Sequence, residues 1–111
     1  MSGTGLLGDF EQLVLLALLQ RREDGYALPI RREIEAATDR AVSRGALYRT
    51  LDRLTEKGLV RFAVEPATPE RGGNARKRFE VTRDGIEALR RARSVVGKLS
   101  AGLEGVLEVA P

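Results

Sequence analysis

Arginines and small residues lie close together between positions 43 and 53, where they could form contacts with nucleic acid. Arg44 and Arg49 can each donate two parallel hydrogen bonds to a guanine edge or grip a phosphate, and the Tyr48 hydroxyl can bond a phosphate oxygen. Gly45 has no side chain and would permit close approach. The residues of this segment that we predict to contact DNA are Ser43, Arg44, Gly45, Tyr48, Arg49 and Arg53.

Each of these side chains also has a simpler interpretation. An arginine-rich helix face can serve solubility alone. Tyr48 lies at the edge of the polar face, where its ring could equally pack on the core and leave only the hydroxyl in water. Arg53 and Asp52 could pair with neighbours on the same helix. The order of the predicted elements, given below, favours the nucleic-acid interpretation.

Positive charge is concentrated in the middle third of the chain. The 111 residues carry a net charge of +3, yet residues 40–78 contain ten Lys or Arg against four Asp or Glu. A basic stripe of this kind favours a polyanionic partner, although exposed hairpin tips are often charged without binding anything. The residues between positions 57 and 78 of this stretch that we predict to contact DNA are Lys57, Arg71, Gly72, Gly73, Asn74, Arg76, Lys77 and Arg78.

The chain contains no cysteine and no histidine. Disulfides and thiolate metal sites are therefore excluded, and the commonest general base and metal ligand are missing. No phosphate-binding loop or glycine-rich dinucleotide turn occurs, and the acidic residues are scattered among basic ones. The sequence predicts no catalytic residue, no metal, no cofactor and no enzymatic activity.

The longest strongly apolar run, Leu13 to Leu19, is far too short to cross a bilayer, and no positively charged segment precedes it. The absence of cysteine fits a reducing compartment. We therefore expect a soluble, cytoplasmic protein with no membrane partner.

Three helices should position the predicted DNA-contacting residues between Ser43 and Arg53. The first runs from Asp9 to about Arg21, with Gln12 at capping-box spacing, and is apolar on more than one face. The second runs from about Tyr26 to Ala37. In the third, Ser43 is a natural N-cap, and Lys57 with Gly58 forms a typical helix end.

Two strands and a last helix should follow. Apolar residues alternate in the segments 60–65 and 78–82, and the stretch between them is rich in Pro, Gly and Asn, which predicts a hairpin with a long loop. Thr82 caps the last helix. Its apolar residues alternate at spacings of three and four, which is a heptad seam: Leu89, Ala92, Val96, Leu99, Leu103 and Val106.

This order predicts a mainly α fold with a small β-hairpin, a winged helix-turn-helix followed by a C-terminal dimerisation helix. The predicted parts are a flexible N-terminal arm (1–8), the DNA-binding domain (9–82) and the dimerisation helix with its tail (83–111). A single small domain cannot cover both the seam and the apolar first helix, so we expect a homodimer. The predicted interface residues are Phe10, Leu13, Leu16, Leu89, Ala92, Val96, Leu99, Leu103 and Val106.

Four segments together resemble the PadR family of bacterial transcriptional regulators: LGDFEQLVLLALL, GYALPIRREIEAAT, SRGALYRTLDRLTEKGLV and TPERGGNARKRFEVTRDGIEAL. The resemblance implies a homodimer that binds operator DNA, usually as a repressor, with the last helix of each subunit packed on the partner's first helix. The chain is similar to the short subfamily with one C-terminal helix. Some short members bind planar drugs at the dimer centre through tryptophan, which this sequence lacks.

We therefore predict a homodimeric transcriptional repressor that binds a pseudo-palindromic, double-stranded operator. One alternative is a winged helix that holds a partner protein and does not bind DNA. Another makes the dimer interface a sensor pocket for a small apolar effector.

Overall fold

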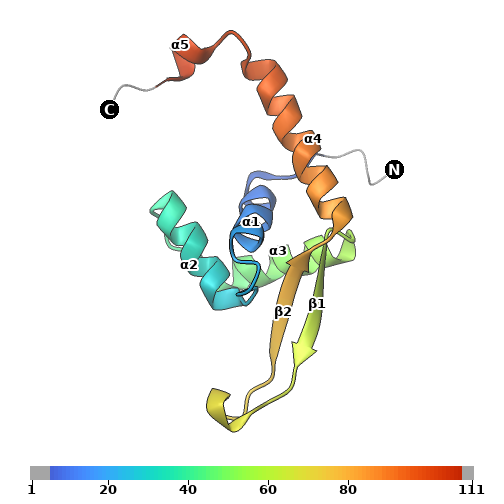
Figure 1. Ribbon diagram of the computed structural model, residues 1–111. Coiled ribbons are helices and arrows are strands. Elements are labelled where there is room, and N and C mark those ends of the chain that lie inside the picture. The colour runs from blue at the N-terminus through green and yellow to red at the C-terminus, as the bar shows by residue number, and fades with distance from the viewer. Residues whose placement is uncertain (1–5, 109–111) are drawn as a thin grey trace.

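The computed structural model describes residues 6–108, which form three helices, a two-stranded hairpin and a long fourth helix (Figure 1). This arrangement confirms the predicted fold class. The hairpin and the fourth helix extend in opposite directions from the three-helix body (Figure 1). The elements are α1 Asp9–Gln20, α2 Ala27–Thr38, α3 Arg44–Glu56, β1 Val60–Glu65, the short 3-10 helix η2 Pro69–Arg71, β2 Arg76–Val81, α4 Arg83–Ser100 and α5 Glu104–Leu107.

The predicted caps Ser43 and Thr82 are confirmed, whereas the cap predicted for the first helix is corrected. The Ser43 hydroxyl accepts a hydrogen bond from the Ala46 N–H at 3.0 Å, and the Thr82 hydroxyl accepts one from the Gly85 N–H at 3.1 Å. In α1, however, the cap is Gly8, because the Glu11 carboxylate reaches back to the Gly8 N–H at 2.9 Å. The capping pair predicted for Asp9 and Gln12 is therefore wrong.

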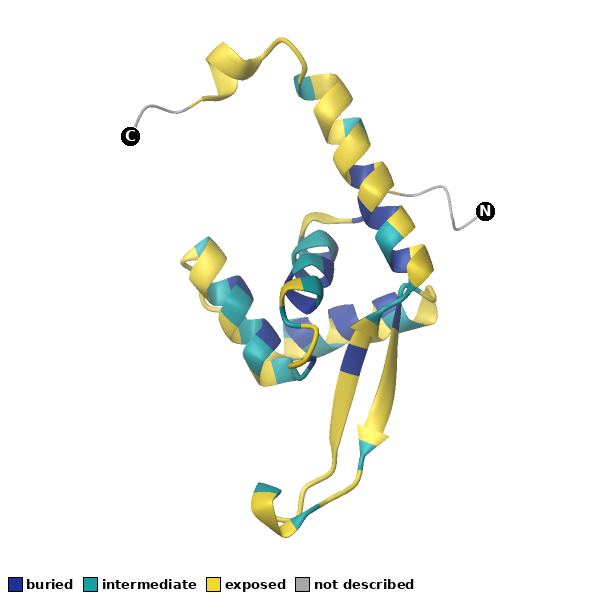
Figure 2. Cartoon of the chain, viewed as in Figure 1, coloured by how far each residue is buried: buried dark blue, intermediate teal, exposed yellow. Residues whose placement is uncertain are grey.

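The core lies where α1, α2, α3, the base of the hairpin and the first half of α4 meet (Figure 2). Its largest fully buried side chains are Leu15, Ile30, Leu47, Leu51, Leu54, Val14 and Val60. The core also includes Ala88, Leu89 and Ala92 of α4. The core is therefore continuous across position 82, the predicted boundary between the DNA-binding domain and the dimerisation helix.

Part of the predicted flexible arm also belongs to this core. Residues 1–5 lie outside the described residues, but Leu7 is only 9% exposed and packs into the core cluster. The side chain of Gln12 donates a hydrogen bond to the Leu7 carbonyl at 3.3 Å. The segment just before α1 is thus held in place.

The hairpin pairs its strands in antiparallel register, with Val60 opposite Val81 and Phe62 opposite Phe79. Only Val60 and Phe79 are buried, whereas Phe62 is 40% exposed and Val64 is 61% exposed. The alternating pattern predicts both strands, although β2 begins at Arg76, two residues before the predicted segment. It does not reveal that the distal half of the hairpin projects beyond the helices. At the base, the Phe79 N–H donates to the Gly25 carbonyl at 2.7 Å.

The last helix is shorter than the heptad spacing predicts. It ends at Ser100, because Gly102 turns the chain with a φ of +83° before the short α5 begins. The apolar seam therefore does not run along one continuous helix as far as Val106. Leu89 and Ala92 lie inside this chain's own core, whereas Val96 and Leu99 are exposed at 60% and 76%.

No helix in residues 6–108 is both long enough and apolar enough to span a bilayer.

Candidate nucleic-acid interface

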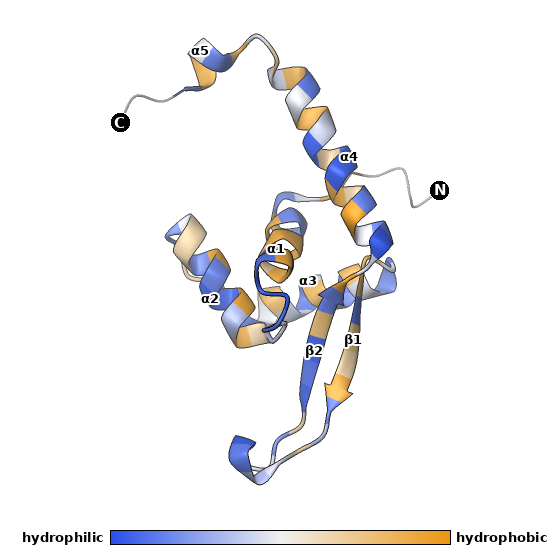
Figure 3. Cartoon of the chain, in the orientation of Figure 1, coloured by the Kyte–Doolittle hydropathy of each residue, from blue (hydrophilic) through white to orange (hydrophobic). Residues whose placement is uncertain are grey.

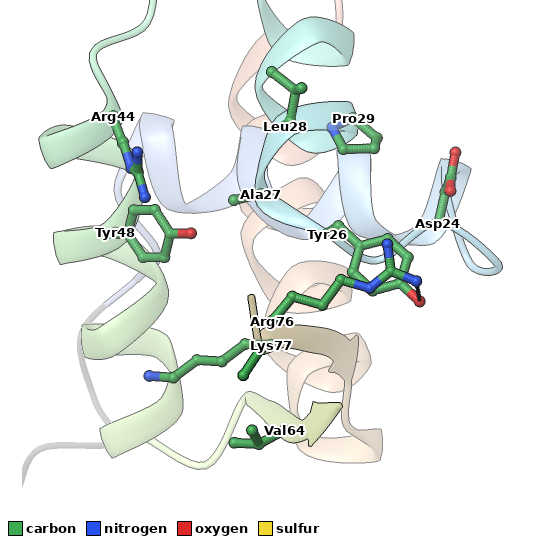
Figure 4. Close-up of a pocket in the computed structure, with 11 residues that line it drawn as sticks. Asp24, Tyr26, Ala27, Leu28, Pro29, Arg44, Tyr48, Val64, Arg76 and Lys77 are labelled. Atoms are coloured by element: carbon green, nitrogen blue, oxygen red, sulfur yellow. Dashed lines mark hydrogen bonds between the residues drawn. The ribbon is translucent and has the colours of Figure 1, made fainter. Parts of the chain in front are cut away.

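A groove of about 810 Å³ lies between the first turns of α2 and α3 and the two strands of the hairpin (Figure 4). Arg44 and Tyr48 line it from α3, and Arg76 and Lys77 line it from β2. The fold thus brings the two separately predicted basic segments to one concave surface. The α2 side of the groove, formed by Tyr26, Ala27, Leu28 and Pro29, was not predicted. Leu28 could have indicated this side of the groove, because it is an apolar residue in the first turn of a helix. This residue is 47% exposed.

The outer side of α3 carries the predicted recognition residues. Arg44, Gly45, Arg49 and Arg53 are exposed, while Leu47, Thr50, Leu51 and Leu54 face the core. Tyr48 is half-buried, and the guanidinium of Arg44 lies 5.5 Å from its ring centroid. Its hydroxyl points into the groove (Figure 4). We call Arg44, Gly45, Tyr48 and Arg49 the recognition face.

Gly45 is not required by the packing of this chain. A Cβ at Gly45 would meet only the flexible guanidinium of Arg49, at 3.2 Å. By contrast, a Cβ at the buried Gly25 would lie 2.2 Å from the backbone oxygen of Phe79. The space above Gly45 is therefore open to a molecule outside the chain.

Some side chains of the hairpin form hydrogen bonds with other described residues, and others are exposed without such bonds. Arg71 donates hydrogen bonds to the carbonyls of Pro66 and Asn74 and so holds the loop, while Arg78 donates to the Arg22 carbonyl at 3.2 Å. Gly72 and Gly73 form the tip of the loop with φ values of +69° and +80°. Lys77 lies over the Phe62 ring, with its ammonium 4.3 Å from the centroid.

Arg76 belongs to a cluster that joins the hairpin to the start of α2. Its Nε donates to Glu65 at 2.9 Å, and its guanidinium stacks 3.8 Å from the centroid of the Tyr26 ring (Figure 4). The Tyr26 hydroxyl also donates to Glu65, at 2.9 Å. The hydrogen bonds from Arg76 and then Tyr26 lower the pKa of Glu65 below its usual value. Much of the charge of Arg76 is thus neutralised within the chain.

Arg53 and Lys57 are likewise paired with a carboxylate, that of Glu11 in α1. Glu11 accepts hydrogen bonds from Lys57 Nζ at 2.8 Å and Arg53 Nε at 3.3 Å. Burial acts to raise the pKa of Glu11, but the hydrogen bonds from Lys57, the Gly8 N–H and Arg53 outweigh it and the net pKa is lowered. Glu11 was not predicted from the sequence, because its partners lie more than forty positions away.

Several basic side chains on this side of the molecule keep an unpaired charge. Arg71 and Arg78 bond only to backbone carbonyls of the described residues. Within residues 6–108, Arg44, Arg49 and Lys77 form no ion pair with a carboxylate. The same residues contain no cluster of acidic side chains that could hold a metal ion. The surface can therefore offer hydrogen-bond donors and positive charge to an anionic partner.

Comparisons with known proteins identify a matching protein family. The model of the transcriptional regulator PadR-like family matches residues 15–91. A PadR-like transcription factor from Bacteroides fragilis is 25% identical with a TM-score of 0.70, and the match covers 87% of this chain and 88% of that one. A PadR-like transcriptional regulator from Bacillus cereus is 21% identical with a TM-score of 0.68, over 91% and 93% of the two chains.

A third solved structure is F93 from STIV, a winged-helix DNA-binding protein. It is 18% identical with a TM-score of 0.64, over 88% of this chain and 98% of that one, and at this identity it supports the fold alone. No curated protein matches the sequence.

Proposed function

This chain belongs to the PadR-like family of transcriptional regulators, and from that premise we propose that it is a homodimeric repressor of a pseudo-palindromic operator. Members of this family are DNA-binding regulators and not enzymes. The observation that carries the proposal is the recognition face, where Arg44 and Arg49 lie beside the open space at Gly45 and pair with no carboxylate in residues 6–108.

The basic residues divide into two roles. Arg44 and Arg49 read base edges in the major groove, because the guanidinium fork can donate two hydrogen bonds to one guanine edge. Lys77, Arg71 and Arg78 contact phosphates, which adds affinity for every sequence. The exposed tip, Gly72 to Asn74, approaches the minor groove. Arg76 mainly holds the hairpin against the start of α2, because its side chain is bound to Glu65 and Tyr26.

The dimer is proposed to form through α4 and α1. Val96, Leu99, Leu103 and Val106 are all exposed, and Figure 3 shows apolar residues continuing along α4 beyond the body of the molecule. Phe10, Leu13 and Leu16 of α1 are only half-buried and offer a second apolar surface. An exposed apolar surface of this kind is typical of an interface. In this proposal residues 9–82 bind DNA and residues 83–111 join the subunits.

The experiment that tests DNA binding is a titration of duplex DNA at several salt concentrations. Affinity should fall steeply as salt rises, because each neutralised phosphate releases a counterion and contributes about 0.9 to the slope of log affinity against log salt. A flat response would contradict a basic interface. No binding to any duplex at low salt would leave the winged helix as a protein-interaction module.

Gly45→Ala should affect stability and DNA binding in opposite directions. Alanine should stabilise α3 by up to about 1 kcal/mol, because glycine is the poorer helix former. The added methyl group should weaken operator binding several-fold, since it fills the open space and displaces the Arg49 guanidinium 3.2 Å away. Thermal unfolding and operator titration measure the two effects.

Gly97→Ala is the matched control. Gly97 is exposed in α4, and no neighbouring atom lies within 4 Å of the position that the added methyl group would take. The same substitution should therefore stabilise its helix and leave DNA affinity unchanged. If both alanine variants bind the operator as the natural protein does, the space at Gly45 is not used by DNA.

A further inference from the structure

Glu11 lies in the first turn of α1, and only 7% of its side chain is exposed. One carboxylate oxygen accepts from the Gly8 N–H at 2.9 Å. The other accepts from Lys57 Nζ at 2.8 Å and Arg53 Nε at 3.3 Å. A single buried carboxylate therefore binds two cations of the helix that carries the recognition face.

Arg53 and Lys57 are placed where they could contact DNA phosphates if they were released from Glu11. Arg53 lies in the last turn of α3, and Lys57 caps the end of that helix four residues later. Their side chains remain 52% and 45% exposed. Arg53 also follows Arg49 by one turn, so it continues the recognition face toward the end of the helix. Both side chains are long enough to turn from Glu11 toward a neighbouring phosphate backbone.

The contacts to Glu11 oppose that release. A buried carboxylate is screened by salt much less than an exposed one, and leaving it without its cations would be costly. The exposed pairs Arg61–Glu80 and Arg90–Glu87 lack this property, because both partners in each pair are more than half exposed. The Glu11 pairing is therefore the one expected to persist when DNA arrives.

We propose that Glu11 is a positioning residue of the DNA-binding surface, whose buried carboxylate holds Arg53 and Lys57 on the protein and so limits sequence-independent binding to DNA phosphates. This inference rests on the proposed function. Phosphate contacts strengthen binding to every sequence, and two further cations on α3 would increase it. The carboxylate thus keeps affinity for random DNA low while Arg44 and Arg49 remain free to contact bases.

The test is Glu11→Gln, titrated with a random duplex in the purified full chain. Glutamine keeps the size of the side chain but removes the charge that retains both cations. Binding should become tighter than in the natural protein. The slope of log affinity against log salt should steepen by about 1 to 2, since up to two phosphates are newly neutralised. The ratio of the variant's affinity to that of the natural protein should then fall about 4- to 16-fold between about 50 and 200 mM salt.

Glu87→Gln is the matched control, because it removes the same charge from an exposed pair on α4. Equal affinities and equal salt slopes for the two glutamine variants would overturn the inference, since a merely structural role of Glu11 would not change the slope. If the natural protein binds no duplex at all, the proposed function fails instead.

A triple variant, Glu11→Gln with Arg53→Gln and Lys57→Gln, keeps the test decisive if Glu11→Gln alone folds poorly. It leaves no unpaired charge at the site. Its affinity for random DNA and its salt slope should match those of Arg90→Gln, which has the same net charge. A slope lower by about 1 to 2 would mean that Arg53 and Lys57 already contact phosphates, which overturns the inference.

Discussion

Leu99→Glu is expected to convert the protein to monomers and to weaken operator binding by about 100-fold or more. Leu99 is 76% exposed in the single chain, so the substitution should leave the fold of the subunit intact. In the proposed dimer it would put a carboxylate into an apolar interface, where an unpaired charge is very unfavourable. Each monomer would then bind one half-site, without the gain of about 10²- to 10⁴-fold that two linked sites provide.

Sedimentation equilibrium measures the first effect, and titration of an operator duplex measures the second. Ser94→Glu is the matched control, since it adds the same charge to an exposed position of α4 on the side away from Val96 and Leu99. It should remain dimeric. If Leu99→Glu also stays dimeric, the subunits do not associate through this face of α4.

Arg49→Ala should cost about 1 to 3 kcal/mol on the operator, and much less on random DNA. Arg49 lies on the side of α3 opposite the buried Leu47 and Leu51, so its removal should not disturb the core. It pairs with no carboxylate in the described part of the chain, so its guanidinium is free to donate two hydrogen bonds to one base.

The operator is first defined by sequencing the DNA fragments that the purified protein retains. Both duplexes are then titrated with the variant and with Arg90→Ala, which removes an exposed arginine from α4. The control should bind both duplexes nearly as the natural protein does. Equal losses on the two duplexes for Arg49→Ala would show that Arg49 grips phosphate and does not read a base.

Local signals in the sequence determined most of the elements. Ser43 and Thr82 cap their helices through hydrogen bonds that span three residues, and the apolar spacing around Leu47, Leu51 and Leu54 shows which side of α3 is buried. The alternation between Val60 and Val81 predicted the hairpin. These features depend on interactions within one or two turns or between adjacent strands, so the sequence alone determines them.

The tertiary structure decided which charges are free and which apolar residues are exposed. Glu11 meets Arg53 and Lys57 across 42 and 46 positions, and Tyr26 meets Glu65 across 39. The apolar spacing of α4 likewise did not show that Leu89 would be buried and Leu99 exposed. Composition and spacing cannot assign such partners, because each contact depends on how distant elements pack together.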